Sequence, residues 1–262
     1  MKNSRVPSPK DIPSRQGAVS DAEWAARVDL AAAYRLVALF GWDDLIFTHI
    51  SMRCPDEEGE PRFLINPYGL FFEEMTASSL VKVNFAGEIV DDTPYAVNPA
   101  GFTIHSAIHM ARPDVHCVLH LHTDYGVAVS AQSEGLLPLS QNALTILDKV
   151  AYHDYEGIAL DHDERERLVA DLGDKYLMIL RNHGTLAAAP TCSLAFTAIY
   201  LLERACKIQI LAQAGDGLIA LDAAMAARVA EQTNVQMLDD AINLVWPALL
   251  RRLDRENPGY DE

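Results

Sequence analysis

Apolar residues recur along the chain with two different periods, and these periods predict a mixture of helices and strands. Short spacers between several strand-like runs indicate hairpins, which exclude a purely parallel sheet. The sequence therefore predicts an α/β fold, a single three-layer domain with a central mixed or antiparallel β-sheet flanked by helices. The predicted helices span residues 20–39, 102–111, 123–131, 140–147, 162–172, 191–214 and 223–253 (with a break near Pro247), and the predicted strands span 45–53, 62–65, 81–84, 88–90, 115–121, 150–153 and 176–181.

The chain before the first predicted helix differs from the rest. Residues 1–19 are polar and proline-containing, so we expect a flexible N-terminal arm that is disordered or lies on a neighbouring subunit. Ser20 followed by Glu23 is a capping-box pattern that opens the first helix. We find no internal repeat and no domain-sized linker after it, so residues 20–262 are expected to form one domain.

Composition and charge narrow the range of partners. Half of the 262 residues are hydrophobic, and the formal net charge is −16. Such a surface repels a polyanionic phosphate backbone and an anionic bilayer, so we expect neither nucleic acid nor a membrane as partner. No apolar run is long enough to cross a bilayer, and the first residues lack the apolar core of a secretory signal. The four cysteines form no CxxC pair, which favours reduced thiols and a cytoplasmic location.

Three histidines at the ends of predicted strands are the strongest chemical signal. His120 and His122 close one strand, and residues two apart project from the same face, with backbones roughly 7 Å apart. His183 follows a second strand and precedes Gly184, which we expect to let the backbone turn sharply. Three imidazole nitrogens match the usual ligand number of a catalytic zinc site, which keeps a further position open for water or substrate.

The alternative interpretation is that these histidines only pack or form hydrogen bonds. Nine histidines in 262 residues is not a metal-rich composition, and the His-x-His pair alone fits either interpretation. The third histidine, after a second strand, favours the metal site. We expect His116 to be structural or exposed and His109 to be a packed polar side chain.

The segments around these histidines resemble the class II aldolase/adducin family over about residues 24–215. The resemblance is carried by Ala111–Asp114, His120–His122 and Arg181–Gly184, in that order. In this family the corresponding histidines hold a catalytic divalent metal. The resemblance therefore implies that His120, His122 and His183 bind such a metal, with zinc expected and manganese, iron or cobalt as alternatives.

Within the family, the chain most resembles the adducin head and its bacterial relatives, and it departs from the sugar-phosphate aldolases in two places. Gly101 stands where those enzymes have their acid/base glutamate, and the preceding Pro99 and Ala100 replace two phosphate-binding serines. Tyr68 replaces a phosphate-binding threonine, although Gly69 is kept. We therefore expect a small, non-phosphorylated substrate, of aromatic or carboxylated character. The segments of likeness to adducin are Thr48–Ser51, Leu64–Leu70, Ala100–Phe102 and Val150–Gly157.

With the family glutamate replaced, another group must move the proton. The candidates are Glu156, His49 and His105, and also His153 beside Glu156. For each, the alternative is a hydrogen-bonded polar side chain in a packed loop or helix. Candidate substrate-binding residues are Tyr68, Gly69, Gly101 and Arg181, the last of which could hold a carboxylate or pair with the acidic surface.

Three functions remain open at this stage. The first is a metal-dependent lyase, an aldolase or decarboxylase, because the three histidines are intact. The second is a non-catalytic adducin-head-like scaffold, because Gly101 cannot transfer a proton. The third is a sugar epimerase. The resemblance also implies a homotetramer, in which the N-terminal arm and the C-terminal helix, with Trp246 and Tyr260, could complete a neighbour's site.

Overall fold

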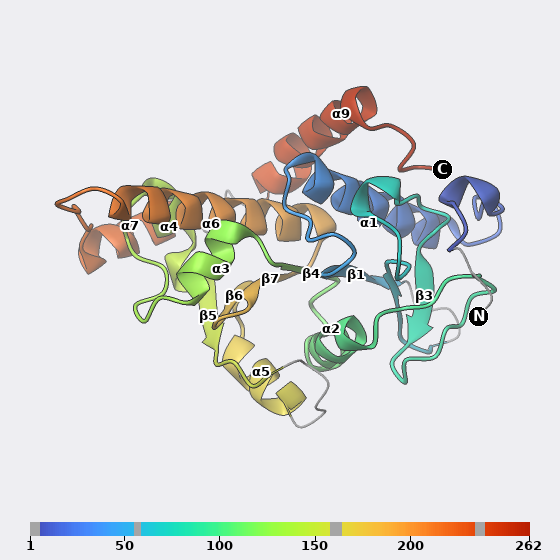
Figure 1. Ribbon diagram of the computed structural model, residues 1–262, viewed down its shortest axis with the longest axis horizontal. Coiled ribbons are helices and arrows are strands. Elements are labelled where there is room, and N and C mark those ends of the chain that lie inside the picture. Colours follow the sequence, from blue (N-terminus) through green and yellow to red (C-terminus); the bar gives the residue numbers. More distant parts are fainter. Residues whose placement is uncertain (1–5, 55–58, 158–163, 234–238) are drawn as a thin grey trace.

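A seven-stranded sheet forms the middle layer of the computed structural model, which describes residues 6–54, 59–157, 164–233 and 239–262 (Figure 1). The strand order is β3-β2-β1-β4-β7-β6-β5, and neighbouring strands are antiparallel except for the parallel pair of β5 and β6. The predicted mixed sheet is therefore confirmed. The strands are β1 (His49–Cys54), β2 (Arg62–Ile65), β3 (Val81–Asn84), β4 (Cys117–Leu121), β5 (Val150–His153), β6 (Leu177–Leu180) and β7 (Gly184–Ala189).

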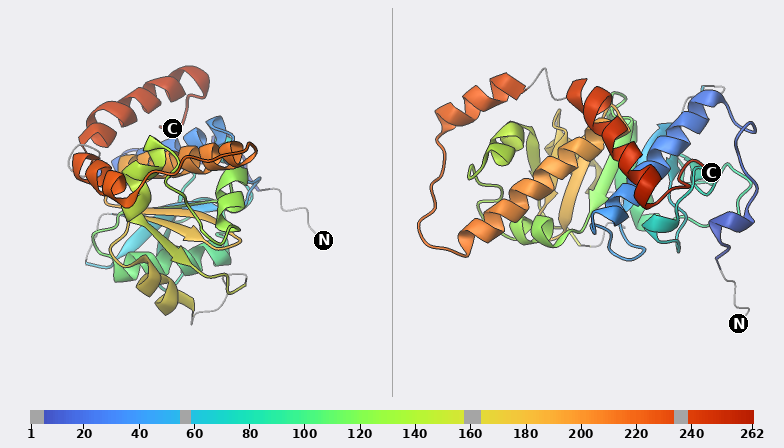
Figure 2. Two further views of the ribbon diagram at one scale, coloured as in Figure 1. Left: turned by 90° about the vertical axis from the view of Figure 1, so that its left-hand side faces the viewer. Right: turned by 90° about the horizontal axis from the view of Figure 1, so that it is seen from above.

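Helices cover both faces of the sheet, which gives the three predicted layers (Figures 1 and 2). On one face lie α1 (Asp21–Leu39), α3 (Asp124–Ser130), α4 (Gln141–Ile146) and α6 (Cys192–Gln213), with α7 (Ala223–Thr233) and α9 (Trp246–Glu256) packed outside them. On the other face lie α2 (Pro99–Ala111) and α5 (Glu164–Leu172). The short helical turns are η1 (Pro9–Asp11), η2 (Phe72–Glu74), η3 (Leu147–Lys149) and the π-helical η4 (Ala241–Val245).

Alternation along β4 determines which layer each side chain faces. Leu119 and Leu121 belong to the core beneath α1 and α6, whereas Val118 belongs to the core beneath α2 and α5. Because successive residues of a strand point to opposite faces, His120 points to the α2 side with Val118. The central position of β4 thus places a histidine inside the α2 layer, at the end of the strand.

Side chains cap the helices where the sequence indicates. Ser20 accepts a hydrogen bond from the Glu23 backbone nitrogen at 3.2 Å, as a capping box requires. The Glu23 carboxylate, however, pairs with Arg27 at 2.8 Å and with Lys82 at 2.6 Å. This buried ion cluster joins α1 to β3, so only half of the predicted capping box is formed.

The strand predictions were wrong in three places. The strand expected at 45–53 begins only at His49, because Leu45 and Thr48 have φ values of +52° and +64°, in the left-handed region. The expected strand at 88–90 is a single bridge to Val83. The sequence analysis missed β7, although this strand pairs with both β4 and β6.

The helix ends differ less from expectation. The break expected near Pro247 is a π-helical turn directly before α9, and Pro247 lies within the first turn of that helix. Expected elements that include residues 55–58, 158–163 or 234–238 lie partly outside the described residues.

Both chain ends contact their own domain where they are described. In the N-terminal segment, the Arg15 backbone nitrogen donates to Ser78 at 3.1 Å, and Tyr95 donates to the Pro7 carbonyl at 3.2 Å. The flexibility of residues 1–19 stays a prediction. Trp246 and Tyr260 are each 7% exposed within this single chain, so these two side chains are not available to a neighbour's site.

Candidate metal centre

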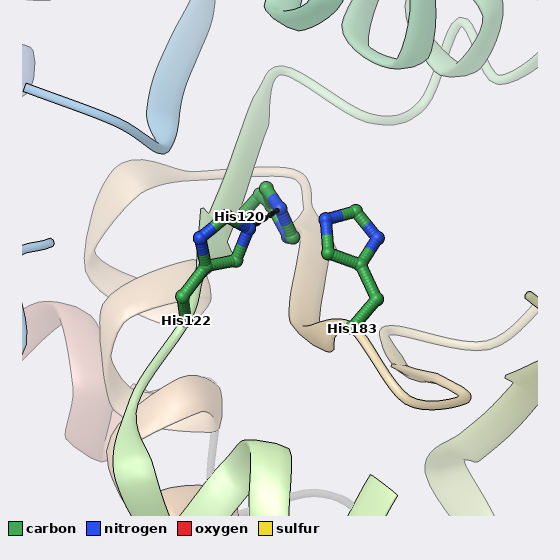
Figure 3. A group of neighbouring side chains, drawn as sticks. All are labelled: His120, His122 and His183. Atoms are coloured by element: carbon green, nitrogen blue, oxygen red, sulfur yellow. Dashed lines mark hydrogen bonds between the residues drawn. The ribbon is translucent and has the colours of Figure 1, made fainter. Parts of the chain in front are cut away.

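Three imidazole rings meet at the ends of two strands. His120 lies near the end of β4, His122 directly follows that strand, and His183 lies in the turn between β6 and β7 (Figure 3). The Nε2 atoms of His120 and His122 are 3.0 Å apart, and the His183 ring centroid is 4.8 Å and 4.9 Å from theirs. One ligand atom from each ring lies within 4.8 Å of the others, so the three can share one small cation.

Hydrogen bonds to the opposite nitrogens determine the tautomers of two rings. The Nδ1 of His120 lies 3.0 Å from the Thr185 carbonyl oxygen, and the Nδ1 of His122 lies 3.0 Å from an Asp44 carboxylate oxygen. Both partners can only accept, so both Nδ1 atoms donate. The two Nε2 lone pairs then face each other at 3.0 Å, an arrangement that repels unless a proton or metal ion lies between them. Such carboxylate and carbonyl partners are typical of histidines that bind metals.

Burial favours the neutral, metal-binding form of these rings. It holds the pKa of His120 well below its usual value, and it lowers the pKa of His183 to about 4. Neighbouring imidazoles lower both values further. At pH 7 these two histidines are therefore neutral in the folded chain, which is the state that a metal ligand requires.

Gly184 has a different role from the one expected. Asn182, with φ of +55°, takes the left-handed conformation in the turn, so the expectation that Gly184 provides it was wrong. A Cβ atom on Gly184 would lie 2.3 Å from the Leu121 carbonyl oxygen. It would also lie 3.2 Å and 3.3 Å from ring atoms of His122 and His120, which is closer than ordinary van der Waals contact. The glycine therefore permits the close approach of β7 to β4 at the metal centre.

His49 extends the group of rings along the sheet. It pairs with His120 across β1 and β4, and its ring stacks on that of His120 at 5.9 Å. The His105 ring stands perpendicular to the His49 ring, with the two centroids 5.4 Å apart. Burial lowers the pKa of His49 to about 3. The structure thus brings two of the three predicted catalytic residues, His49 and His105, close to the triad.

A chain of hydrogen bonds orients His105. The Nδ1 of His109 faces the Val115 carbonyl at 3.4 Å, so His109 offers its Nε2 as an acceptor to Ser51 at 2.8 Å. Ser51 then donates to His109 and accepts from the Nδ1 of His105 at 2.6 Å. This order leaves the buried Nε2 of His105 as an acceptor with no hydrogen-bond partner among the described residues. The expectation that His109 is a packed polar side chain is confirmed.

Glu156, the third predicted catalytic residue, is exposed and paired with Arg167, with Nε and Oε1 2.7 Å apart. That hydrogen bond keeps the pKa of Glu156 below its usual value. His153 faces Asp171 at 2.7 Å and Glu164 at 3.5 Å. Glu156 and His153 line one small cavity together with His183.

The predicted substrate-binding residues lie in different places. Arg181 contributes to the cavity beside His183, but its guanidinium stacks on Tyr152 at 4.5 Å and donates to the Gln132 carbonyl at 2.7 Å. Tyr68 is 38% exposed, and within the described residues no hydrogen bond or ring contact joins it or Gly69 to the triad. Gly101 belongs to the first turn of α2. The surroundings of residues 99–101 lie outside the described part of the structure.

Sequence reasoning missed three residues that support the triad. They are Asp44, which bonds His122, Thr185, whose carbonyl bonds His120, and Glu203, which bonds Thr185. Asp44 lies near His122, and Thr185 near His120, only because distant parts of the chain meet at β4. No pattern around them in the sequence indicates this.

Comparison with known proteins decides the family. The sequence profile described as Class II Aldolase and Adducin N-terminal domain matches residues 28–210. The chain belongs to the class II aldolase and adducin family. The resemblance and the fold class derived from the sequence are both confirmed.

Individual members of the class II aldolase and adducin family show how wide the likeness is. A Caulobacter vibrioides protein, named for the class 2 aldolases without a stated substrate, is 58% identical over 94% of this chain and 96% of its own. Alpha-adducin from Rattus norvegicus is 50% identical, over 78% of this chain but only 28% of that protein. The solved structure of an L-fuculose 1-phosphate aldolase from Glaciozyma antarctica PI12 matches with a TM-score of 0.76 at 29% identity, covering 94% of this chain and 96% of that one.

The family includes enzymes and adducins, so membership alone does not assign an activity. Among the described residues, no helix combines the length and the apolar character needed to span a bilayer. All four cysteines are buried and free.

Proposed function

We propose that this protein is a divalent-metal-dependent lyase, of aldolase or decarboxylase type, that acts on a small, non-phosphorylated hydroxy-carbonyl or carboxylate compound. The observation that carries the proposal is the convergence of His120, His122 and His183 with two of the rings fixed through their Nδ1 atoms. The likeness to an L-fuculose 1-phosphate aldolase supports it.

The donor set fits a divalent metal, and zinc is the ion we propose. Manganese, iron and cobalt are alternatives, because imidazole nitrogens bind each of them and availability decides among them. When bound, such an ion polarises a carbonyl and stabilises negative charge on the neighbouring carbon. The chain's own contribution is to hold three neutral imidazoles in place, with Asp44 and Thr185 fixing the orientation of two rings.

Proton movement is assigned to His49 and His105. The hydrogen bonds from Val115 through Ser51 present the Nε2 of His105 as an acceptor, and the ring of His49 contacts the rings of both His105 and His120. This arrangement offers two neutral bases next to the metal centre, in place of the glutamate that the sugar-phosphate aldolases use. Glu156 remains a second candidate, and it would first have to leave Arg167.

The substrate class follows from what the chain lacks relative to the sugar-phosphate enzymes. Pro99, Ala100 and Tyr68 offer fewer neutral donors to a phosphate than the serines and threonine they replace. We therefore propose that Tyr68, Gly69, Gly101 and Arg181 bind a substrate without a phosphate group.

The test is a cleavage assay on metal-loaded protein. A panel of non-phosphorylated hydroxy-carbonyl and carboxylate compounds is incubated with the wild type and with His122→Ala, and carbonyl products and carbon dioxide are quantified. We expect turnover of at least one compound class, loss of that turnover in His122→Ala, and an unchanged assembly by light scattering. Full activity in His122→Ala would exclude a metal-dependent lyase.

A non-catalytic scaffold is the second candidate. The 50% identity to alpha-adducin and the glycine at position 101 favour it. It predicts no turnover of any compound in the panel. A sugar epimerase would instead interconvert a free sugar without cleaving it, which the same assay detects by following the substrate's stereoisomers.

We also propose that the chain works in the cytoplasm as a homotetramer. Free, buried cysteines support a reducing compartment. The family likeness supports the oligomer. A mass of one chain by light scattering would exclude the tetramer.

A further inference from the structure

Glu203 is a buried carboxyl group on α6 that the proposed metal chemistry does not use. Its side chain is only 4% exposed. Burial raises the pKa of this carboxyl to about 7, and the groups that oppose the rise are threonine hydroxyls rather than cations. Burying a carboxyl without a cation is unfavourable, so its position calls for an explanation.

Two threonines hold the Glu203 carboxyl. The Thr185 hydroxyl donates to Oε1 at 3.3 Å, and the Thr123 hydroxyl also bonds the carboxyl. The Thr123 oxygen in turn accepts from the Gly126 backbone nitrogen at 3.2 Å, which caps α3. A carboxyl on α6 therefore connects the start of α3 with the start of β7.

The packing of this group against α3 leaves no room for a side chain at position 126. A Cβ atom on Gly126 would lie 2.6 Å from the Glu203 Oε1, 2.7 Å from the Thr123 Oγ1 and 2.9 Å from the Thr185 Cγ2. Real Cβ atoms essentially never come this close to other atoms. The three side chains thus converge on one point, and the glycine makes the convergence possible.

The two threonines belong to the segments that carry the metal ligands. Thr123 directly follows His122. Thr185 lies two residues after His183, and its carbonyl oxygen accepts the 3.0 Å hydrogen bond from the Nδ1 of His120. His122 and His183 lie outside the paired strands, so the ladder of the sheet does not fix them.

We infer that Glu203 is a positioning residue for the metal centre: through Thr123 and Thr185 it holds together the two segments that carry His120, His122 and His183. The inference rests on the proposed function, since it assumes that the triad binds a metal. The inference adds a role for a side chain of α6, which covers the face of the sheet opposite to the one that His120 points to.

The test compares metal binding by Glu203→Ala and Glu203→Gln. Cobalt(II) is the probe, because its visible spectrum reports the geometry of its ligands. Affinity is measured by titration against a chelator. We expect Glu203→Ala to weaken cobalt binding about tenfold or more and to change the spectrum. Glu203→Gln can still accept from both hydroxyls, so it should bind within about threefold of the wild type.

Thr185→Val and Asp29→Ala complete the experiment. Thr185→Val removes one hydroxyl at constant shape, and we expect an intermediate loss of affinity even if Glu203→Ala fails to fold. Asp29→Ala is the matched control, since burial also raises the pKa of Asp29 and its partner is a neutral donor, the Trp246 indole at 3.0 Å. It should leave the cobalt spectrum and affinity unchanged.

The outcomes separate the two claims. If the wild type binds cobalt and Glu203→Ala and Thr185→Val bind it with the same affinity and spectrum, the role of Glu203 is wrong and the metal site stands. If Asp29→Ala lowers the affinity as much as Glu203→Ala does, the effect is general destabilisation, which also contradicts the inference. If the wild type binds no cobalt, both the inference and the proposed function fail.

Discussion

Replacing Gly184 by alanine should separate two strands at the metal centre. The added Cβ would lie 2.3 Å from the Leu121 carbonyl oxygen, whereas ordinary van der Waals contact begins near 3.4 Å. The overlap is therefore about 1 Å, and it falls on a backbone atom rather than on a flexible side chain. Because Leu121 and Thr185 face each other across β4 and β7, relief of the overlap must move one strand relative to the other.

This displacement acts on both stability and metal binding. Overpacking of a well-packed core costs about 1–3 kcal/mol, so we expect the free energy of unfolding to fall by that amount. Ligand distances in metal sites hold to within about 0.2 Å, and a shift of up to about 1 Å of His120 relative to His183 exceeds that tolerance. We therefore expect metal affinity to fall at least about tenfold.

Denaturant unfolding of the metal-free protein and chelator competition of the metal-loaded protein measure the two effects separately. Gly215→Ala is the matched control, because its φ is not positive and its nearest contact would be the Ala212 carbonyl oxygen at 3.8 Å. It should change neither quantity. If Gly184→Ala has the same free energy of unfolding and the same metal affinity as Gly215→Ala, metal binding does not require the close approach of β7 to the histidines.

Three further predictions concern single carboxyl groups. Asp44→Asn should lower metal affinity about 10–100-fold, because the neutral amide no longer orients the His122 ring with a negative charge. Competition with a chelator measures this affinity. An unchanged affinity would mean that Asp44 does not support the metal centre. Glu23→Gln leaves Arg27 and Lys82 with one charged partner fewer, and urea unfolding should show a loss of about 3–5 kcal/mol; a loss below about 1 kcal/mol would mean that the cluster is well solvated. In the folded chain the pKa of Glu203 is about 7, above its ordinary value of 4.5. The protonated carboxyl's contribution to the free energy of unfolding is therefore complete below pH 4.5 and is lost as the pH rises to 7. The unfolding free energy of the wild type should therefore fall relative to Glu203→Gln by up to about 3 kcal/mol over that range, and parallel pH profiles would contradict the raised pKa.

The sequence predicted the layers of the fold and the triad because both depend on local patterns. Period-2 and period-3.6 runs marked most strands and helices, and His-x-His at the end of a buried strand placed two candidate ligands together. The strand β7 (Gly184–Ala189) was missed because three of its six residues are alanine and one is glycine, and neither residue favours strands. Small residues suit this strand for a reason that no local pattern reveals, since β7 lies between β4 and β6 and approaches the histidines closely.

The surroundings of the triad could not be predicted because they depend on register. Nothing in the sequence shows that His49 lies opposite His120, which follows from the pairing of β1 with β4. Glu203 occurs in a long amphipathic helix, where one charged residue normally marks a solvated face, yet its side chain is buried. Its two partners come from separate elements, Thr123 at the start of α3 and Thr185 in β7. Long-range pairing of strands, not residue type, brings these groups together.

The metal content of the purified protein tests the central claim most directly. The chain should be produced without a histidine tag and without added metal, and divalent metals should be quantified per chain in the wild type and in His120→Ala. The metal centre described here predicts close to one ion per chain in the wild type and loss of that ion in His120→Ala. No metal in the wild type, with none regained after incubation with zinc, manganese, iron and cobalt, would contradict it, and the adducin-like scaffold would become the better account.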